Sequence, residues 1–228
     1  MSSAADAGLP LLVIGNRNYS SWSLRAWLFA AHAGIAIDTL RLPLDTPEFR
    51  RRIGDYSPTG RVPVLIHGTL HVWDSLAICE YLAEAFAVAR AWPEDLANRA
   101  QARSLACEMH AGFPDLRKEL PMNCRARDRR LVPSPAARQD IDRVIAIWEA
   151  RLGRQGPWLF GEFGIVDAMF APVGMRFLTY GVTVPAASAA WIDALIALPA
   201  MREWLQEARA ECEVQAAEEV GMPASPPS

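Results

Sequence analysis

The sequence is poor in cysteine, nearly balanced in charge and free of long apolar runs, and each of these features excludes a class of protein. Its four cysteines are scattered over 228 residues without a Cys-x-x-Cys pair, which favours a reducing compartment over a disulfide framework or a zinc site. The net charge of -3 argues against nucleic acid or an acidic membrane as the main partner. No apolar stretch approaches the roughly 18 residues that a membrane span requires.

The amino-terminal segment and the histidines exclude two further classes. Residues 1–10 lack the charged and apolar regions of a secretory signal. The histidines are not spaced as metal ligands relative to the cysteines or carboxylates. We therefore expect a cytoplasmic protein with no metal, no membrane partner and no nucleic-acid partner.

Residues 9–87 alternate between strand-like and helix-like patterns in the order β-α-β-α-β-β-α. The apolar run 11–14 predicts a buried strand, and apolar residues at helical spacing predict a helix over 22–34. Two strand-like runs on either side of Gly68 predict a hairpin, and a further helix begins at Ser75. Strands joined through helices are expected to be parallel, with the hairpin adding an antiparallel edge.

Residues 95–215 lose the strand signal and predict an all-helical domain. Pro114 should end or kink the first helix, which is expected over 95–120. The further helical segments are expected at 141–152, 166–179, 191–198 and 201–210. The tail, residues 216–228, is rich in proline and serine and is predicted to be disordered.

A pair of serines stands between the first strand and the first helix. Ser20 and Ser21 follow Tyr19, and Arg25 lies further along the predicted helix. Hydroxyls at a helix N-terminus favour an anion there, because the unpaired amides and the helix dipole are positive. Taken alone, the serine pair is better explained as a helix cap.

Two further segments favour a functional role for the serine pair. Residues 57–65 read SPTGRVPVL, and residues 73–78 read WDSLAI. With the serine loop, these segments stand in the order and at the spacing seen in cytosolic glutathione transferases, whose corresponding patterns are NPxGxVPxL and [EQD]-S-x-A-I. Over nearly its whole length the chain resembles this family, and within it the serine-type classes near the zeta and related bacterial branches.

The resemblance implies an α/β thioredoxin-like domain followed by an all-α helical bundle. Residues 9–87 would bind glutathione as co-substrate, and residues 95–215 would form the pocket for a small electrophile. The expected activity is glutathione transfer in detoxification, by a homodimer in which each first domain faces the partner's helical domain.

In serine-type enzymes a hydroxyl donates a hydrogen bond to the glutathione sulfur. The free thiol has a pKa near 8.5, so lowering it by two units requires only about 2.7 kcal/mol. Alignment on Arg25 assigns this role to Ser20, but some serine classes would select Ser21, so both stay candidates. Trp22 stands where the zeta motif has a cysteine, which argues against thiol-exchange chemistry.

The resemblance also assigns the glutathione-binding residues. Val62-Pro63 is expected to be a cis peptide, so that the Val62 backbone pairs with the cysteinyl backbone of glutathione. Arg61 would approach the glycyl carboxylate. Asp74 would receive the γ-glutamyl ammonium, and Ser75, at a helix N-terminus, the γ-glutamyl carboxylate.

The electrophile pocket is expected between the domains, lined by Tyr19, Trp22, Arg103 and His110. His110 is left out of the catalytic set, since no neighbouring group completes a catalytic arrangement. Arg117 and Lys118 could attract an anionic substrate, but both are expected on a solvated face. A glutathione-dependent isomerase of the maleylacetoacetate type, or a non-catalytic ligand-binding or protein-interaction module, would use the same fold.

Asp167 is expected to serve the fold. It occupies the acidic position of the family's Ser/Thr-x-x-Asp capping box, but Gly164 stands where the hydroxyl would be. Asp167 is therefore expected to stabilise the start of a long helix.

Overall fold

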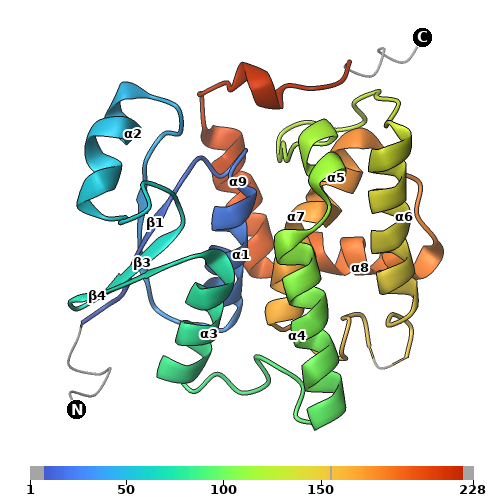
Figure 1. The fold of residues 1–228 in the computed structure, drawn as a ribbon, viewed down its shortest axis with the longest axis horizontal. Helices are drawn as coiled ribbons and strands as arrows, with labels where there is room; N and C mark the ends of the chain where they lie inside the picture. Colours follow the sequence, from blue (N-terminus) through green and yellow to red (C-terminus); the bar gives the residue numbers. More distant parts are fainter. Residues whose placement is uncertain (1–7, 155, 223–228) are drawn as a thin grey trace.

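The computed structural model describes residues 8–154 and 156–222, in which a small sheet with its helices packs against a larger helical half (Figure 1). The strands are β1 (Leu11–Ile14), β2 (Asp38–Arg41), β3 (Val64–His67) and β4 (Leu70–Trp73). The helices of the first half are α1 (Ser21–His32), α2 (Pro47–Arg52) and α3 (Ser75–Ala85), with the 3-10 turn η2 (Ile53–Asp55). The second half contains α4 (Leu96–Ala111), α5 (Pro114–Glu119), α6 (Pro135–Glu149), α7 (Ile165–Tyr180), α8 (Ala186–Ala197), α9 (Pro199–Ala210) and η3 (Ala216–Glu218).

The sheet confirms the predicted strands but corrects the direction of one. Its order is β2-β1-β3-β4, with β1 parallel to β2 and the β3–β4 hairpin antiparallel, as expected. However, β3 is antiparallel to β1. The expectation of parallel neighbours is wrong here because β3 does not pair with β2. The connection between them carries only the short α2 and delivers β3 to the other side of β1, in the opposite direction.

The side chains of β1 alternate between two hydrophobic cores. Leu12 and Ile14 join the large core with α1 and α3, whereas Val13 points to a smaller cluster near Phe49 of α2. Successive strand residues face opposite sides of a sheet, so this short strand, buried on both faces, serves both cores. The loop that leaves its end is therefore held on a rigid element.

Helix α7 lies at the centre of the helical half and joins it to the first half. Nearly all of its side chains are buried, and it packs against both α1 and α4. A helix that is apolar on all sides belongs in a core, and one hydrophobic cluster accordingly runs through both halves. The break expected at Pro114 is confirmed, since α4 ends at Ala111 and α5 begins at Pro114. No helix of the described residues is both long and apolar enough to cross a membrane.

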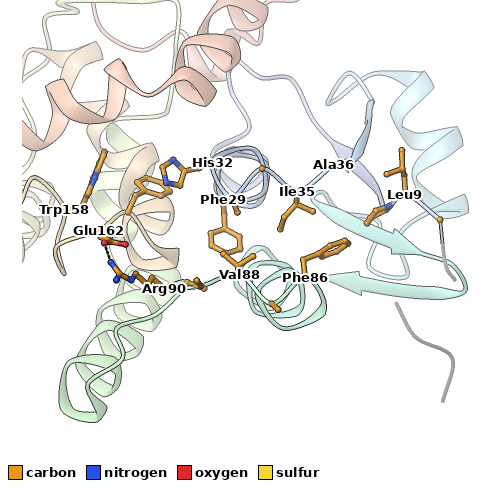
Figure 2. Close-up of a pocket in the computed structure, with 18 residues that line it drawn as sticks. Leu9, Phe29, His32, Ile35, Ala36, Phe86, Val88, Arg90, Trp158 and Glu162 are labelled. Atoms are coloured by element: carbon orange, nitrogen blue, oxygen red, sulfur yellow. Dashed lines mark hydrogen bonds and ion pairs between the residues drawn. The ribbon is translucent and has the colours of Figure 1, made fainter. Parts of the chain in front are cut away.

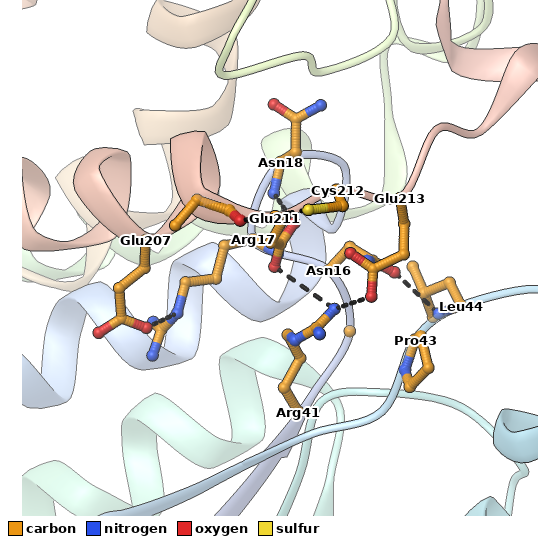
Figure 3. A network of polar contacts seen from close by, with 12 residues as sticks. Asn16, Arg17, Asn18, Arg41, Pro43, Leu44, Glu207, Glu211, Cys212 and Glu213 are labelled. Carbon is orange, nitrogen blue, oxygen red and sulfur yellow. Dashed lines mark hydrogen bonds and ion pairs between the residues drawn. The ribbon is translucent and has the colours of Figure 1, made fainter.

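After α9 the chain returns to the loop between β1 and α1. The Glu211 carboxylate accepts hydrogen bonds from the backbone N–H of Arg17, at 2.7 Å, and of Asn18, at 3.1 Å. Arg41 of β2 pairs with Glu213 at 2.8 Å (Figure 3). These contacts fix the C-terminal segment against the end of β1 that precedes the serine pair.

Residues 216–222 differ from the disorder predicted for them. Residues 216–218 form the 3-10 turn η3, and the Glu219 carboxylate accepts hydrogen bonds from the Tyr19 hydroxyl at 2.7 Å and the Asn123 amide at 2.8 Å. Composition indicates a polar, unstructured segment, but these specific bonds to distant residues hold it in place. The remainder of the predicted tail, residues 223–228, lies outside the described residues.

Candidate functional site

The loop after β1 places hydroxyl groups at the N-terminus of α1. Ser20 is the N-cap, and its Oγ lies 3.4 Å from the Ser23 backbone nitrogen and donates to Ser23 Oγ at 2.7 Å. Ser23 Oγ also accepts a hydrogen bond from the Gly15 backbone N–H at 3.1 Å. Ser21, the first residue of the helix, is buried like Ser20. The cap predicted from the sequence is present.

Both serines line a cavity of about 500 Å³ between the two halves of the molecule. We call it the serine cavity. Tyr19 and Trp22 contribute to its wall from the same loop and helix, while Arg117 of α5 and Arg176 of α7 contribute from the helical half. With Arg61 from the first half, a chemical group held here would therefore lie near the positive end of α1 and three guanidinium groups.

A second cavity, of about 540 Å³, adjoins the serine cavity and is named here the Asp74 cavity. Its lining includes Val62, Pro63, Asp74, Ser75 and His110. The Val62-Pro63 peptide is cis, as expected. The lining residues common to both cavities are Trp22, Arg61 and Val62. An elongated ligand can therefore extend from one cavity into the other.

Asp74 and Ser75 occupy the start of α3. One Asp74 oxygen accepts the Leu76 N–H at 2.9 Å, and the other lies 3.0 Å from His110 Nε2. Asp74 also has a left-handed backbone conformation, with φ of 78°. The Ser75 hydroxyl is buried and has no hydrogen-bond partner within the described residues. Because buried polar groups are nearly always paired, the Ser75 hydroxyl points to a ligand in the Asp74 cavity.

His110 approaches the site from α4. Its ring meets Trp22 edge-on at 5.1 Å between centroids, as well as contacting Asp74. Burial lowers the pKa of His110, and the Asp74 carboxylate opposes that shift. His110 therefore lines the Asp74 cavity, and its contact with the Asp74 carboxylate accounts for the position of its ring.

Comparison with known proteins fits this geometry. A family model for the N-terminal domain of glutathione S-transferases matches residues 19–85, and one for their C-terminal domain matches residues 85–207. The chain belongs to the glutathione S-transferase family.

Individual relatives match over shorter stretches. Glutathione S-transferase 1 of Dianthus caryophyllus is 43% identical over 143 residues, which is 60% of this chain and 62% of that protein. Dichloromethane dehalogenase of Methylophilus leisingeri is 44% identical over 48 residues, 21% of this chain and 17% of that protein. The matched stretch thus spans less than two thirds of these curated relatives.

Solved glutathione transferases share the fold over most of the chain. The theta-class enzyme of Xanthomonas axonopodis pv. citri, solved with glutathione bound, has a TM-score of 0.66 at 25% identity and covers 86% of this chain and 96% of its own. A glutathione transferase homologue from Burkholderia GL BGR1, also with bound glutathione, has a TM-score of 0.70 at 22% identity. Here 89% of this chain and 100% of that chain are covered.

Within this transferase fold, the structure brings together all but one of the predicted site residues. The residues at the two cavities are Tyr19, Ser20, Ser21, Trp22, Arg61, Val62, Pro63, Asp74, Ser75 and His110. Arg103 is placed elsewhere: its side chain is exposed, 3.7 Å from Glu80 and stacked over Trp92. It lies two helical turns before His110, and this distance along α4 keeps it away from both cavities.

Two arginines occupy positions in the site that the sequence did not predict. Arg117, expected on a solvated face, instead donates to the carbonyls of Met109, His110 and Gly112 at the C-terminus of α4. Arg176 is buried on α7. A lone arginine in an otherwise apolar stretch of helix was a signal that could have identified it.

The molecule also has a larger cavity, of about 820 Å³, that the serines do not line. It is lined by Phe29, His32, Phe86 and Trp158, and its charged residues Arg90 and Glu162 pair with each other (Figure 2). None of the buried polar atoms left unpartnered among residues 8–154 and 156–222 belongs to this lining. In that same part of the chain, no group of three His, Cys, Asp or Glu could hold a metal ion.

Proposed function

We propose that this protein is a glutathione transferase that stabilises the glutathione thiolate through Ser20 and adds it to a small electrophile. The observation that carries the proposal is the pair of adjoining cavities. The N-terminus of α1 with Ser20 opens into one, and the N-terminus of α3 with the unpartnered Ser75 opens into the other. The two solved relatives described above were both determined with glutathione bound.

Glutathione would extend along both cavities. Its γ-glutamyl carboxylate would bind the Ser75 hydroxyl at the start of α3, and its ammonium group would bind Asp74. The Val62 backbone would pair with the cysteinyl part of the peptide, and Arg61 would bind the glycyl carboxylate. The thiol would then enter the serine cavity.

Ser20 would act as a hydrogen-bond donor to sulfur. Its hydroxyl donates to Ser23 Oγ in the structure. With glutathione bound it would rotate to donate to the thiolate, and Ser23 would then donate to Ser20. The positive end of α1 favours the same negative charge. The thiol proton leaves to solvent, and the thiolate electron pair forms a carbon–sulfur bond with the electrophilic carbon. Either a leaving group departs with its electron pair or the electrons of a double bond are protonated by water.

The proposal includes a homodimer that works in the cytoplasm in detoxification. Each thioredoxin-like half would face the helical half of the partner subunit. Leu70 and Trp73 on the edge strand β4 are large apolar side chains with 45% and 48% of their surface exposed. Such side chains suit a contact with a second subunit.

Calorimetric titration with glutathione tests the proposal directly. The Ser75→Ala variant tests the predicted contact with the γ-glutamyl carboxylate. Removing a hydroxyl that bonds a carboxylate should raise the Kd for glutathione about tenfold, because bonds to charged groups contribute roughly 1.5–3 kcal/mol. Ser104→Ala is the matched control, since Ser104 is exposed on α4 and bonds the Ala100 carbonyl. An absence of binding by the unaltered protein would overturn the proposed function.

A further inference from the structure

Three arginines from three helices lie close together beside the serine cavity, which Arg117 and Arg176 line while Arg25 is buried behind it. The guanidinium of Arg25, on α1, lies 4.3 Å from the Trp22 ring centroid, and that of Arg117, on α5, lies 5.0 Å from it. Arg176, on α7, is close enough for its charge to act on both of the other arginines. We call these residues the arginine cluster.

The arginine cluster has no carboxylate of its own within the described residues. None of the three arginines forms an ion pair there. Arg25 is completely buried, and all three of its guanidinium nitrogens lack a hydrogen-bond partner. Arg176 donates only to the main-chain carbonyls of Arg117 and Leu120. A buried charge without a partner is costly, so this arrangement calls for an anion from outside the chain.

The lowered pKa values of Arg25 and Arg176 are consistent with the same lack of a neighbouring anion. Burial, together with the neighbouring Arg117, lowers the pKa of Arg176 to about 10. Burial and the other two arginines hold the pKa of Arg25 well below its usual value. With a pKa of about 10, Arg176 remains charged at neutral pH, and a negative charge nearby would favour the charged form of both arginines.

The carboxylates around the arginine cluster leave room for a ligand. The charge of Asp74 acts on Arg25, but Asp74 already contacts the Leu76 N–H and His110. Asp45 and Glu218 line the serine cavity, and the charge of Glu218 acts on Arg176, but neither carboxylate forms an ion pair with Arg176. Burial raises the pKa of Glu218 although the charge of Arg176 opposes that shift. Asp140, which also attracts Arg117, is already bonded to the N–H groups that begin α5. Arg117 and Arg176 therefore face open cavity.

We propose that the electrophile of this transferase carries a carboxylate, which Arg176 binds while Arg117 and Arg25 add positive potential. The inference rests on the proposed function, because it places this carboxylate in the serine cavity beside the glutathione thiolate. The two carboxylates of glutathione have other partners, at Ser75 and Arg61. The thiolate at Ser20 would supply one negative charge to this cavity. The arginine cluster carries more than one positive charge, so it could take a second anion from the second substrate.

The arginine cluster would also ease the reaction itself. A thiolate and a carboxylate repel each other, and the neighbouring guanidinium charges offset that repulsion. For a conjugated ketone acid, the thiolate pair forms the carbon–sulfur bond and the alkene electrons move to the ketone oxygen. Water then returns a proton to carbon. The arginine cluster would stabilise the negative charge throughout these steps.

A matched pair of substrates tests the inference: 3-benzoylacrylate and its methyl ester, which share the reactive alkene but differ in charge. Each kcat/KM is divided by the uncatalysed rate constant with glutathione. We expect the acid-to-ester ratio to exceed one by about tenfold or more in the unaltered protein, and to fall about tenfold or more in Arg176→Met. Arg103→Met, outside both cavities, is the control and should leave the ratio unchanged.

Glu218→Gln should change the acid-to-ester ratio in the opposite direction to Arg176→Met. Removing this cavity carboxylate lessens the repulsion felt by an anionic substrate, so the acid-to-ester ratio should rise severalfold. The residue belongs to the C-terminal segment outside the core, so this variant tests the inference even if Arg176→Met does not fold. High salt should lower the ratio in the unaltered protein.

Calorimetry with the unreactive 3-benzoylpropionate separates the two proposals. Binding of this acid but not of its methyl ester, lost in Arg176→Met, supports an anion site whether or not turnover is seen. Turnover of the ester with no preference for the acid in any variant would overturn the inference and leave the proposed transferase intact. Failure to bind glutathione would instead overturn the proposed function.

Discussion

Replacing Ser20 with alanine should lower kcat/KM for glutathione addition by about 100-fold, the typical cost of removing one preorganised donor to a developing anion. Ser20 Oγ lies at the positive end of α1, where its hydroxyl can turn toward the sulfur. Without it, the thiol pKa of bound glutathione should rise toward the free value near 8.5. The ultraviolet absorbance of the thiolate, followed against pH in the presence of protein, measures that shift.

The role of Ser20 as N-cap demands a control, because loss of a cap to alanine costs about 1 kcal/mol of stability. Ser20→Gly removes the same hydroxyl but costs only a few tenths of a kcal/mol at an N-cap. Both variants should therefore lose the same activity at different stabilities. Ser21→Ala should change kcat/KM by less than about threefold. If Ser21→Ala instead raises the thiol pKa and the Ser20 variants do not, Ser21 is the thiol contact.

The parts of the site that the sequence predicts correctly are those set by short-range rules. Ser20 caps α1 and α3 begins at Ser75, as predicted, although the N-cap of α3 is Asp74 and not Ser75. A cap depends on a few neighbouring residues, so its pattern is visible in the chain itself. The same holds for the break before Pro114, which a missing N–H and a fixed ring impose locally.

The parts that sequence reasoning missed depend on contacts between distant segments. Arg117 reads as a surface residue, yet α5 folds back so that its side chain caps the end of α4 and covers Trp22. Residues near Glu219 read as a polar tail, yet they bond to Tyr19, 200 positions earlier. Similarly, the direction of β3 follows from its partner in the sheet. None of these outcomes is encoded in a local period or cap.

Replacing Asp167 with alanine should lower the free energy of unfolding by about 3 kcal/mol, because it leaves buried donors unpaired. This completely buried carboxylate accepts hydrogen bonds from the Trp191 indole at 2.9 Å, the Leu159 N–H at 3.1 Å and the Gly164 N–H at 3.2 Å. Tm should fall by about 6–12 °C, measured by circular dichroism. Asp193→Ala, an exposed carboxylate on α8, should change Tm by no more than about 2 °C.

The pH dependence of stability gives Asp167 a signature that simple loss of packing would not produce. Burial outweighs the hydrogen bonds and raises the pKa of Asp167 from 3.8 to about 6. Between these values the folded state holds a proton that the unfolded state has released, so this contribution to stability declines as pH rises through that window. Asp167→Asn cannot titrate. The stability advantage of the unaltered protein over Asp167→Asn should therefore shrink from pH 4 to pH 6 and then level off. A constant difference across this range would contradict the raised pKa, even if Asp167→Ala is strongly destabilised.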